Sequence, residues 1–186
     1  VRVLRIAYDA LSAEDKAKVT NYSKLVKAEQ IIAQLNVALD RRVGDLNSAL
    51  AEIRVDTLVY ADYDEIYDLR QAYDELGELG HNKVSRVGNL IAAEARLKQL
   101  ENLVPAASLQ IIRQIREMDL RNLDLKNLNL KDLKPEDQKK LLSLSEAYEK
   151  LSDKEKEAVY NYHLVEKTQD AIHVLQESEE LHFEGE

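Results

Sequence analysis

The chain has 186 residues, of which 33% are charged, and its formal net charge is −9 at pH 7. An acidic chain of this kind is not expected to bind nucleic acid or to lie on an anionic membrane, because both attract a cationic protein surface. The sequence contains no cysteine and no run of about 18 apolar residues, so disulfides, thiolate metal sites and membrane insertion are not expected.

Long helices are expected throughout, because only 5 Gly and 2 Pro are available for tight turns. Residues 1–11 place apolar side chains at helical spacing and resemble the last turns of a helix, so we expect the sequence to be part of a longer protein. A signal peptide or a surface anchor would then lie outside it. Ser12 begins the segment S-A-E-D, which predicts an N-cap and a short helix over about residues 13–20.

A heptad pattern of apolar residues runs from Leu25 to Ile53 and passes through Gly44. It predicts one continuous helix that closes the first repeat unit and opens the second. The same spacing recurs from Leu90 to Met118, where Pro105 interrupts it. Since a proline inside a helix costs roughly 3 kcal/mol, we expect a kink or a restart of the helix at this residue.

Two further helices lead into the later part of the chain. The first is predicted over residues 62–76, and two nearby glycines after it predict a looser turn. The second is predicted over residues 135–151, with a proline at its start. The tetrapeptide Ser-Asp-Lys-Glu at residues 152–155 then has the form of a capping box and predicts another short helix over about residues 153–160.

One stretch is written three times, at residues 8–35, 73–100 and 148–175. Each copy has the order Tyr-x-x-Leu, a short polar segment, a Val eleven residues after the Tyr, and an apolar helical pattern that ends on Leu. Repetition of this kind predicts a modular helical array. We therefore expect an all-α fold of tandem three-helix bundles, joined by continuous helices into an elongated rod, because each amphipathic helix must bury its apolar face against others.

The predicted domains are an incomplete first unit at residues 1–40, a second unit at 41–104 and a third at 105–186 with an insertion at 118–133. The insertion repeats a leucine every five residues, each preceded by Asp or Asn, and two such pentads account for the longer spacing before the last copy. The pentads resemble solenoid sequences but do not complete a coil, so we expect an extended loop whose leucines pack on the bundle. A specialised surface is the alternative. The leucines are Leu120, Leu125 and Leu130.

The first copy reads Tyr-Asp-Ala-Leu-Ser-x-Glu-x-Lys-x-x-Val-x-Asn from Tyr8 to Asn21. This pattern resembles the tandem α-helical repeats of secreted and wall-attached multidomain surface proteins of Gram-positive bacteria. The resemblance implies a spacer or accessory module beside adhesive, S-layer or enzymatic domains, located at the bacterial cell surface or in the cell wall. Its partners would be neighbouring domains of the same longer protein, and it implies no catalytic residues. The third copy matches at Tyr148, Leu151, Ser152, Lys156, Val159 and Asn161, and the second departs across the short helix.

Two functions stay open from the sequence. One is a structural spacer or assembly module of an extracellular surface protein. The other is an adhesive module that recognises a glycan, a cell-wall polymer or a protein through Tyr60, Tyr63 and Tyr67, which gather near one helix, or through the 118–133 loop. Tyrosines can stack on sugars or anchor a protein, although most bury the ring and leave the hydroxyl in water. Buried rings would favour the spacer, and exposed rings or leucines would favour adhesion.

Catalytic and metal-binding motifs are not found in the sequence. The four histidines form no H-E-x-x-H pair, and there is no phosphate-binding glycine loop, no G-x-S-x-G segment and no cysteine nucleophile. The acidic cluster from Asp62 to Asp68 lacks the complete EF-hand order and fits the positive end of a helix, with weak calcium binding as the alternative. We therefore expect no enzyme, no metal and no cofactor, unless the fold gathers carboxylates in a concave pocket.

Overall fold

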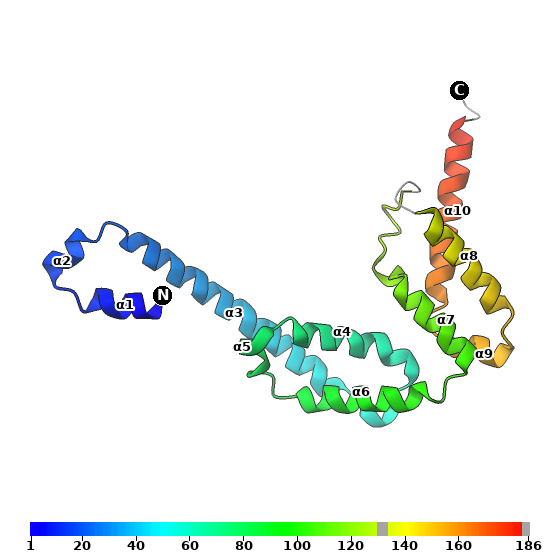
Figure 1. The fold of residues 1–186 in the computed structure, drawn as a ribbon, viewed down its shortest axis with the longest axis horizontal. Coiled ribbons are helices and arrows are strands. Elements are labelled where there is room, and N and C mark those ends of the chain that lie inside the picture. The colour runs from blue at the N-terminus through cyan, green and yellow to red at the C-terminus, as the bar shows by residue number, and fades with distance from the viewer. Residues whose placement is uncertain (130–133, 184–186) are drawn as a thin grey trace. The chain divides into compact units, whose positions relative to one another are not determined.

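The computed structural model describes residues 1–129 and 134–183, with side chains described up to residue 178. Within these residues the chain is all-helical, as predicted, with ten α-helices, three short 3-10 helices and no strand (Figure 1). No helix in the described part of the chain combines the length and apolarity needed to cross a lipid bilayer. The chain divides into two compact units, residues 1–57 with 64–94 and residues 58–63 with 95–186. The division into three units stays a prediction.

The first unit begins with α1 (Arg2–Asp9) and α2 (Ala13–Lys18), followed by the long α3 (Tyr22–Glu52). Ser12 is the N-cap of α2, and its hydroxyl oxygen accepts from the Asp15 backbone N–H at 3.1 Å. α3 continues for 31 residues, which the helical rise converts to about 45 Å. The continuous helix predicted from the heptad pattern is therefore confirmed.

The remaining elements of this unit pack against the C-terminal half of α3. They are η1 (Val55–Thr57), most of α4 (Tyr63–Asp74), α5 (Gly77–His81) and the first part of α6 (Val87–Glu101). Between α6 and α3, Asn89 Nδ2 donates to the Leu50 carbonyl oxygen at 2.9 Å. Gly77 has φ 66°, a conformation that favours glycine, in the turn predicted to differ from the other copies. The buried hydrophobic residues of the unit are Val43, Leu46, Leu50, Ile66, Leu76, Val84, Leu90 and Ala93.

The second unit is built around α7 (Ala106–Glu117), α8 (Pro135–Glu149) and α10 (His163–Phe183). α8 contacts both α7 and α10 (Figure 1). The hydrophobic core lies among the three helices. The shorter elements of the unit are η2 (Tyr60–Asp62), η3 (Leu120–Asn122) and α9 (Asp153–Ala158). The buried residues of its core are Tyr60, Ile111, Ile112, Ile115, Leu120, Leu141, Leu144, Val159, Tyr162 and Val165.

Pro105 interrupts the second heptad run, and the helix restarts after it, as the sequence predicted. α6 ends at Glu101, and α7 begins after Pro105, which is its N-cap. The proline ring fixes a backbone angle that suits the start of a helix and lacks the N–H that a helix interior requires. The helix that links two copies of the repeat is therefore continuous at Gly44 and interrupted at Pro105.

All three copies of the repeat place a short helix between two longer ones: α1-α2-α3, α4-α5-α6 and α8-α9-α10. In the third copy the predicted contact between Ser152 and Glu155 is present. The Glu155 carboxylate accepts from the Ser152 backbone N–H at 2.9 Å and from its hydroxyl at 2.7 Å. These hydrogen bonds favour the charged carboxylate and lower the pKa of Glu155.

Candidate functional site

The three tyrosines proposed for partner binding have different environments. Tyr60 is buried, and its hydroxyl donates to Glu101 Oε2 at 3.0 Å. Tyr63 is half-buried, and the guanidinium carbon of Arg116 lies 3.4 Å from the centroid of its ring. Tyr67 is exposed on α4. The three rings therefore do not form one open tyrosine surface.

Arg116 on α7 connects Tyr60 and Tyr63 to the turn before α10. Its Nε and Nη2 donate to the Tyr160 hydroxyl at 3.1 and 2.7 Å, and its Nη1 donates to the Tyr60 hydroxyl at 3.3 Å. The rings of Tyr60 and Tyr160 meet edge to face, with centroids 6.1 Å apart. We call these residues, with Glu101, the Arg116 cluster. Its aromatic faces and hydroxyls are used for contacts inside the unit.

Burial and hydrogen bonding act against each other in this cluster. Burial disfavours the charge of Arg116, but the hydrogen bonds to Tyr160 and Tyr60 outweigh it, so the pKa of Arg116 is raised. Burial also raises the pKa of the Tyr60 hydroxyl, although the nearby guanidinium acts in the opposite direction. Tyr60 is therefore a neutral phenol at physiological pH, and its hydroxyl can both donate and accept.

The leucine pentads begin in packed structure. Asp119 has φ 52°, in the left-handed region, and is the N-cap of η3. Leu120 then enters the core, and Leu125 is half-buried, whereas Leu130 lies outside the described residues. Between them Asp124 forms a local turn, in which its carboxylate accepts from the side-chain amide of Asn127 at 2.7 Å. This hydrogen bond lowers the pKa of Asp124.

Every copy of the repeat stacks its first tyrosine on a second ring. In the first and third copies the partner is the tyrosine fourteen positions later, and in the second copy that position is Val87. A histidine eight positions after the tyrosine takes the partner's role there, and its Nε2 lies 2.8 Å from the tyrosine carbonyl oxygen. The pairs and their centroid separations are Tyr8 with Tyr22 (4.1 Å), Tyr73 with His81 (4.1 Å) and Tyr148 with Tyr162 (3.5 Å).

Beside each stack, a side-chain pair joins the two long helices of the copy. The partners are 24 residues apart in every case, and they are Arg5 with Glu29, Arg70 with Glu94, and Ser145 with Gln169. The two arginines each donate to both carboxylate oxygens, whereas Gln169 Nε2 donates to Ser145 Oγ at 2.7 Å. The Arg5 guanidinium lowers the pKa of Glu29.

Sequence reasoning missed these stacks and side-chain pairs. Their signal is present in the sequence, because the pair members lie three residues before and twenty-one residues after the repeated tyrosine in all three copies. It is weak because the chemistry changes from a salt bridge in two copies to a neutral hydrogen bond in the third.

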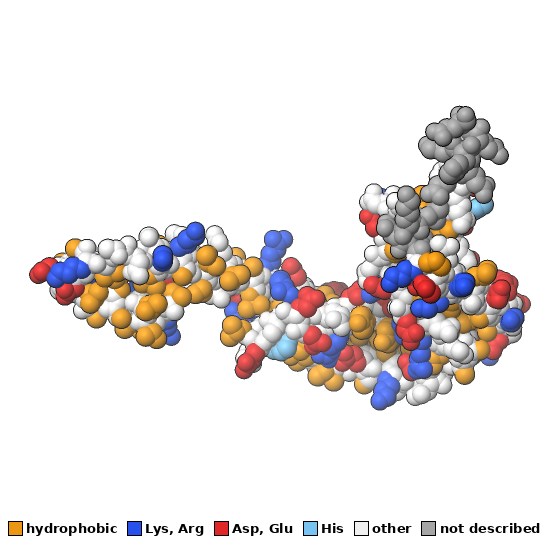
Figure 2. Space-filling model, turned by 45° about the horizontal axis from the view of Figure 1, so that its top comes forward, with side chains coloured by type: hydrophobic (Ala, Val, Ile, Leu, Met, Phe, Trp, Pro, Cys, Tyr) orange, Lys and Arg blue, Asp and Glu red, His pale blue; other side chains and the backbone are white. Residues whose placement is uncertain are grey.

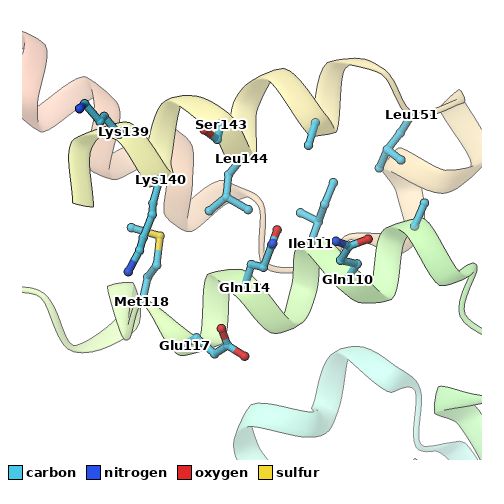
Figure 3. A pocket seen from close by; sticks show the side chains of 12 residues that line it. Gln110, Ile111, Gln114, Glu117, Met118, Lys139, Lys140, Ser143, Leu144 and Leu151 are labelled. Carbon is cyan, nitrogen blue, oxygen red and sulfur yellow. The ribbon is translucent and has the colours of Figure 1, made fainter. Parts of the chain in front are cut away.

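A groove of about 490 Å³ lies between α7 and α8. Figure 3 shows Ile111 and Leu144 pointing into it from the two helices, with Gln114 between them. Lys140 and Met118 lie at one end, and Glu117 points away (Figure 3). Glu117 is the one carboxylate among the residues that line the groove, so these residues supply no pair of carboxylates for acid–base catalysis.

The described residues contain no group of three or more His, Cys, Asp or Glu side chains that could hold a metal ion. In the acidic cluster at the start of α4, the Asp62 carboxylate accepts from the Val59 backbone N–H at 2.9 Å. At least this member of the cluster therefore caps the local backbone, which needs no cation.

Comparison with known proteins found no relative of the chain. No protein-family model, no curated protein and no solved structure matches the chain.

Proposed function

We propose that the chain is a structural spacer or assembly module of an extracellular bacterial surface protein. In this proposal its helices form tandem three-helix bundles arranged as an elongated rod, and its partners are neighbouring domains of a longer protein. The observation that carries the proposal is the repeated contact between the long helices of each copy. All three copies stack a second ring on the repeated tyrosine and join two helices by a side-chain pair at the same two positions.

Burial of the proposed binding residues also supports the spacer. Tyr60 and Leu120 are buried, and Tyr63 is covered on one face by Arg116. Side chains that are buried in the free protein cannot meet a glycan without local unfolding, which costs free energy. Tyr67 is the exposed member of the set.

Small-angle X-ray scattering of the whole chain tests this proposal. A rod of tandem bundles gives a pair-distance distribution with an early maximum and a long tail, whereas a compact particle of 186 residues has a radius of gyration of about 16 Å. We expect a value well above this. A compact particle would overturn the spacer proposal.

Adhesion is the second candidate function, and the groove between α7 and α8 favours it. Its floor of Ile111 and Leu144 is bordered by amide, hydroxyl and ammonium groups, a combination that suits a polar chain such as a glycan or a cell-wall polymer. A binding screen with these polymers tests it, using Gln114→Ala for the groove and Tyr63→Ala and Leu125→Ala for the predicted residues. Binding that Gln114→Ala alone removes would place adhesion in the groove, and no binding in any case would leave the spacer.

A further inference from the structure

The N-terminal helix pair carries an apolar face whose positions are buried or half-buried in the other two copies. Figure 2 shows hydrophobic side chains gathered over this part of the chain. Leu4 on α1 is 63% exposed, whereas Leu144, at the same repeat position in the third copy, is 4% exposed. Ile32 on α3 is 41% exposed, whereas Leu97 at its position in the second copy is 4% exposed. The remaining counterparts, Leu69 and Ile172, are half-buried. Residues at the same repeat position therefore differ greatly in the fraction of the residue that is exposed.

In the later copies a third helix covers this face. The C-terminal half of α3 contacts α5 and the start of α6 in the second copy, and α7 contacts α8 and α9 in the third. The covering residues stand at the same place after the preceding copy, since Leu46 and Leu50 on α3 follow the first copy as Ile111 and Ile115 on α7 follow the second, 65 residues later. All four are buried. The structure thus shows, in two copies, what kind of helix packs on the counterpart of this face.

A polar residue of the first copy is also placed for such a helix. Asn161 in the third copy is 1% exposed, and its Nδ2 donates to the Ile112 carbonyl oxygen of the covering helix at 3.1 Å. Asn21 stands at the same repeat position in the first copy and is exposed. A helix seated like α7 would offer a backbone carbonyl to Asn21 in the same way.

We propose that the face formed by α1 and the N-terminal half of α3 is a docking surface for one amphipathic helix from another unit of this repeat type. The helix carries apolar residues at positions i, i+3, i+4 and i+7, and it takes the place that α7 takes against α8 and α10. The proposal rests on the assembly role proposed above and names the contact by which units would be added.

Titration of the ¹⁵N-labelled full chain with a synthetic peptide of residues 104–118 tests this proposal by NMR. We expect saturable shifts in α1 and the N-terminal half of α3. The variants Leu4→Asp and Ile32→Asp should weaken binding at least about tenfold, because each places a charge against apolar side chains of the peptide. Asn21→Ala should weaken it about threefold to tenfold through the lost hydrogen bond.

Two matched variants serve as controls. Ile6 and Val37 are apolar and exposed, at 60% and 70%, like the residues of the proposed surface. Their counterparts in the second copy are the exposed polar residues Gln71 and Asn102, so these positions lie outside the covered face. Ile6→Asp and Val37→Asp should therefore change binding less than about twofold. A peptide with Ile111→Asp and Ile115→Asp should not bind, which tests the contact without altering the protein.

Three results of the titration would overturn the proposal. They are an absence of binding, peptide-induced shifts confined to α8 and α10, and equal weakening by the control variants. Concentration-dependent dimerisation that Leu4→Asp abolishes, seen by sedimentation without peptide binding, would assign the face to a second copy of the chain and would also overturn it. Failure of docking stays distinct from failure of the spacer role, because the scattering experiment measures the shape of the chain without the peptide.

Discussion

Replacement of Arg116 by methionine tests whether the Arg116 cluster stabilises the second unit. Methionine keeps most of the apolar stem and removes the guanidinium. Three hydrogen bonds to the hydroxyls of Tyr60 and Tyr160 are lost, together with the stacking on Tyr63. With about 1 kcal/mol for each hydrogen bond and about 0.5 to 1 kcal/mol for the cation–π contact, discounted because Tyr60 keeps its bond to Glu101, we expect a loss of about 2 to 4 kcal/mol.

Urea unfolding followed by circular dichroism measures this loss, and amide hydrogen exchange locates it. Exchange should accelerate first in residues 58–63, which the cluster attaches to α7. Arg113→Met is the comparison variant, because Arg113 is exposed on the same helix and its ion pair with Glu101, at 2.5 Å, touches the cluster without removing any contact of Arg116. An exposed ion pair contributes about 0 to 1 kcal/mol. If Arg116→Met cost no more than Arg113→Met, the cluster would be a by-product of the fold and not a stabilising contact.

Three further predictions concern single positions. A Cβ at Gly80 would lie 2.5 Å from the Leu76 Cβ, so Gly80→Ala should destabilise the first unit by about 1 to 3 kcal/mol. A Cβ at Gly44, within α3, would meet no atom within 4 Å, so Gly44→Ala should stabilise the unit by about 0.5 to 1 kcal/mol. Equal thermal unfolding temperatures for the two variants would contradict the packing around Gly80. Asn161→Asp should destabilise the second unit more than Asn161→Ala, because it places a carboxylate where the Asn161 Oδ1 has no hydrogen-bond partner among the described residues; chemical unfolding at pH 7 gives the order. The pKa of Tyr60 is raised above its ordinary value of 10.0, so its contribution to stability is complete below pH 10 and is lost as the pH rises through the folded-state pKa. Urea midpoints between pH 8 and 11 should therefore fall less steeply for Tyr60→Phe than for the wild type, and parallel curves would contradict the assignment.

The helical elements could be predicted from the sequence because their signals are local. The heptad through Gly44, the restart at Pro105 and the cap at Ser12 each depend on residues within one or two turns, and all three appear in the structure. Apolar periodicity identified the buried faces of the later helices, since the buried Leu46, Leu90 and Ile111 all belong to the predicted heptads, whereas Ile32 in the same pattern is exposed.

The Arg116 cluster could not be predicted, because it joins residues far apart in the chain. Tyr60 and Arg116 are 56 residues apart, and Arg116 and Tyr160 are 44 apart. The concentration of tyrosines in sequence around Tyr63 suggested a shared binding surface, but neighbouring residues on one short segment point in different directions. Burial of Tyr60 and exposure of Tyr67 follow from that geometry.

The side-chain pairs between the long helices show which property the three copies share and which one varies among them. The first and second copies use Arg5–Glu29 and Arg70–Glu94, and the third uses Ser145–Gln169 at the same spacing of 24 residues. A salt bridge and a neutral hydrogen bond differ in charge, length and pH response, yet both join the same two helices. Contact between the helices is therefore what the three copies share, and the charge is variable. The repeated positions therefore serve the contact in every copy, but the copies differ in how far these positions are covered, since Leu4 is 63% exposed and its counterpart Leu144 is 4% exposed.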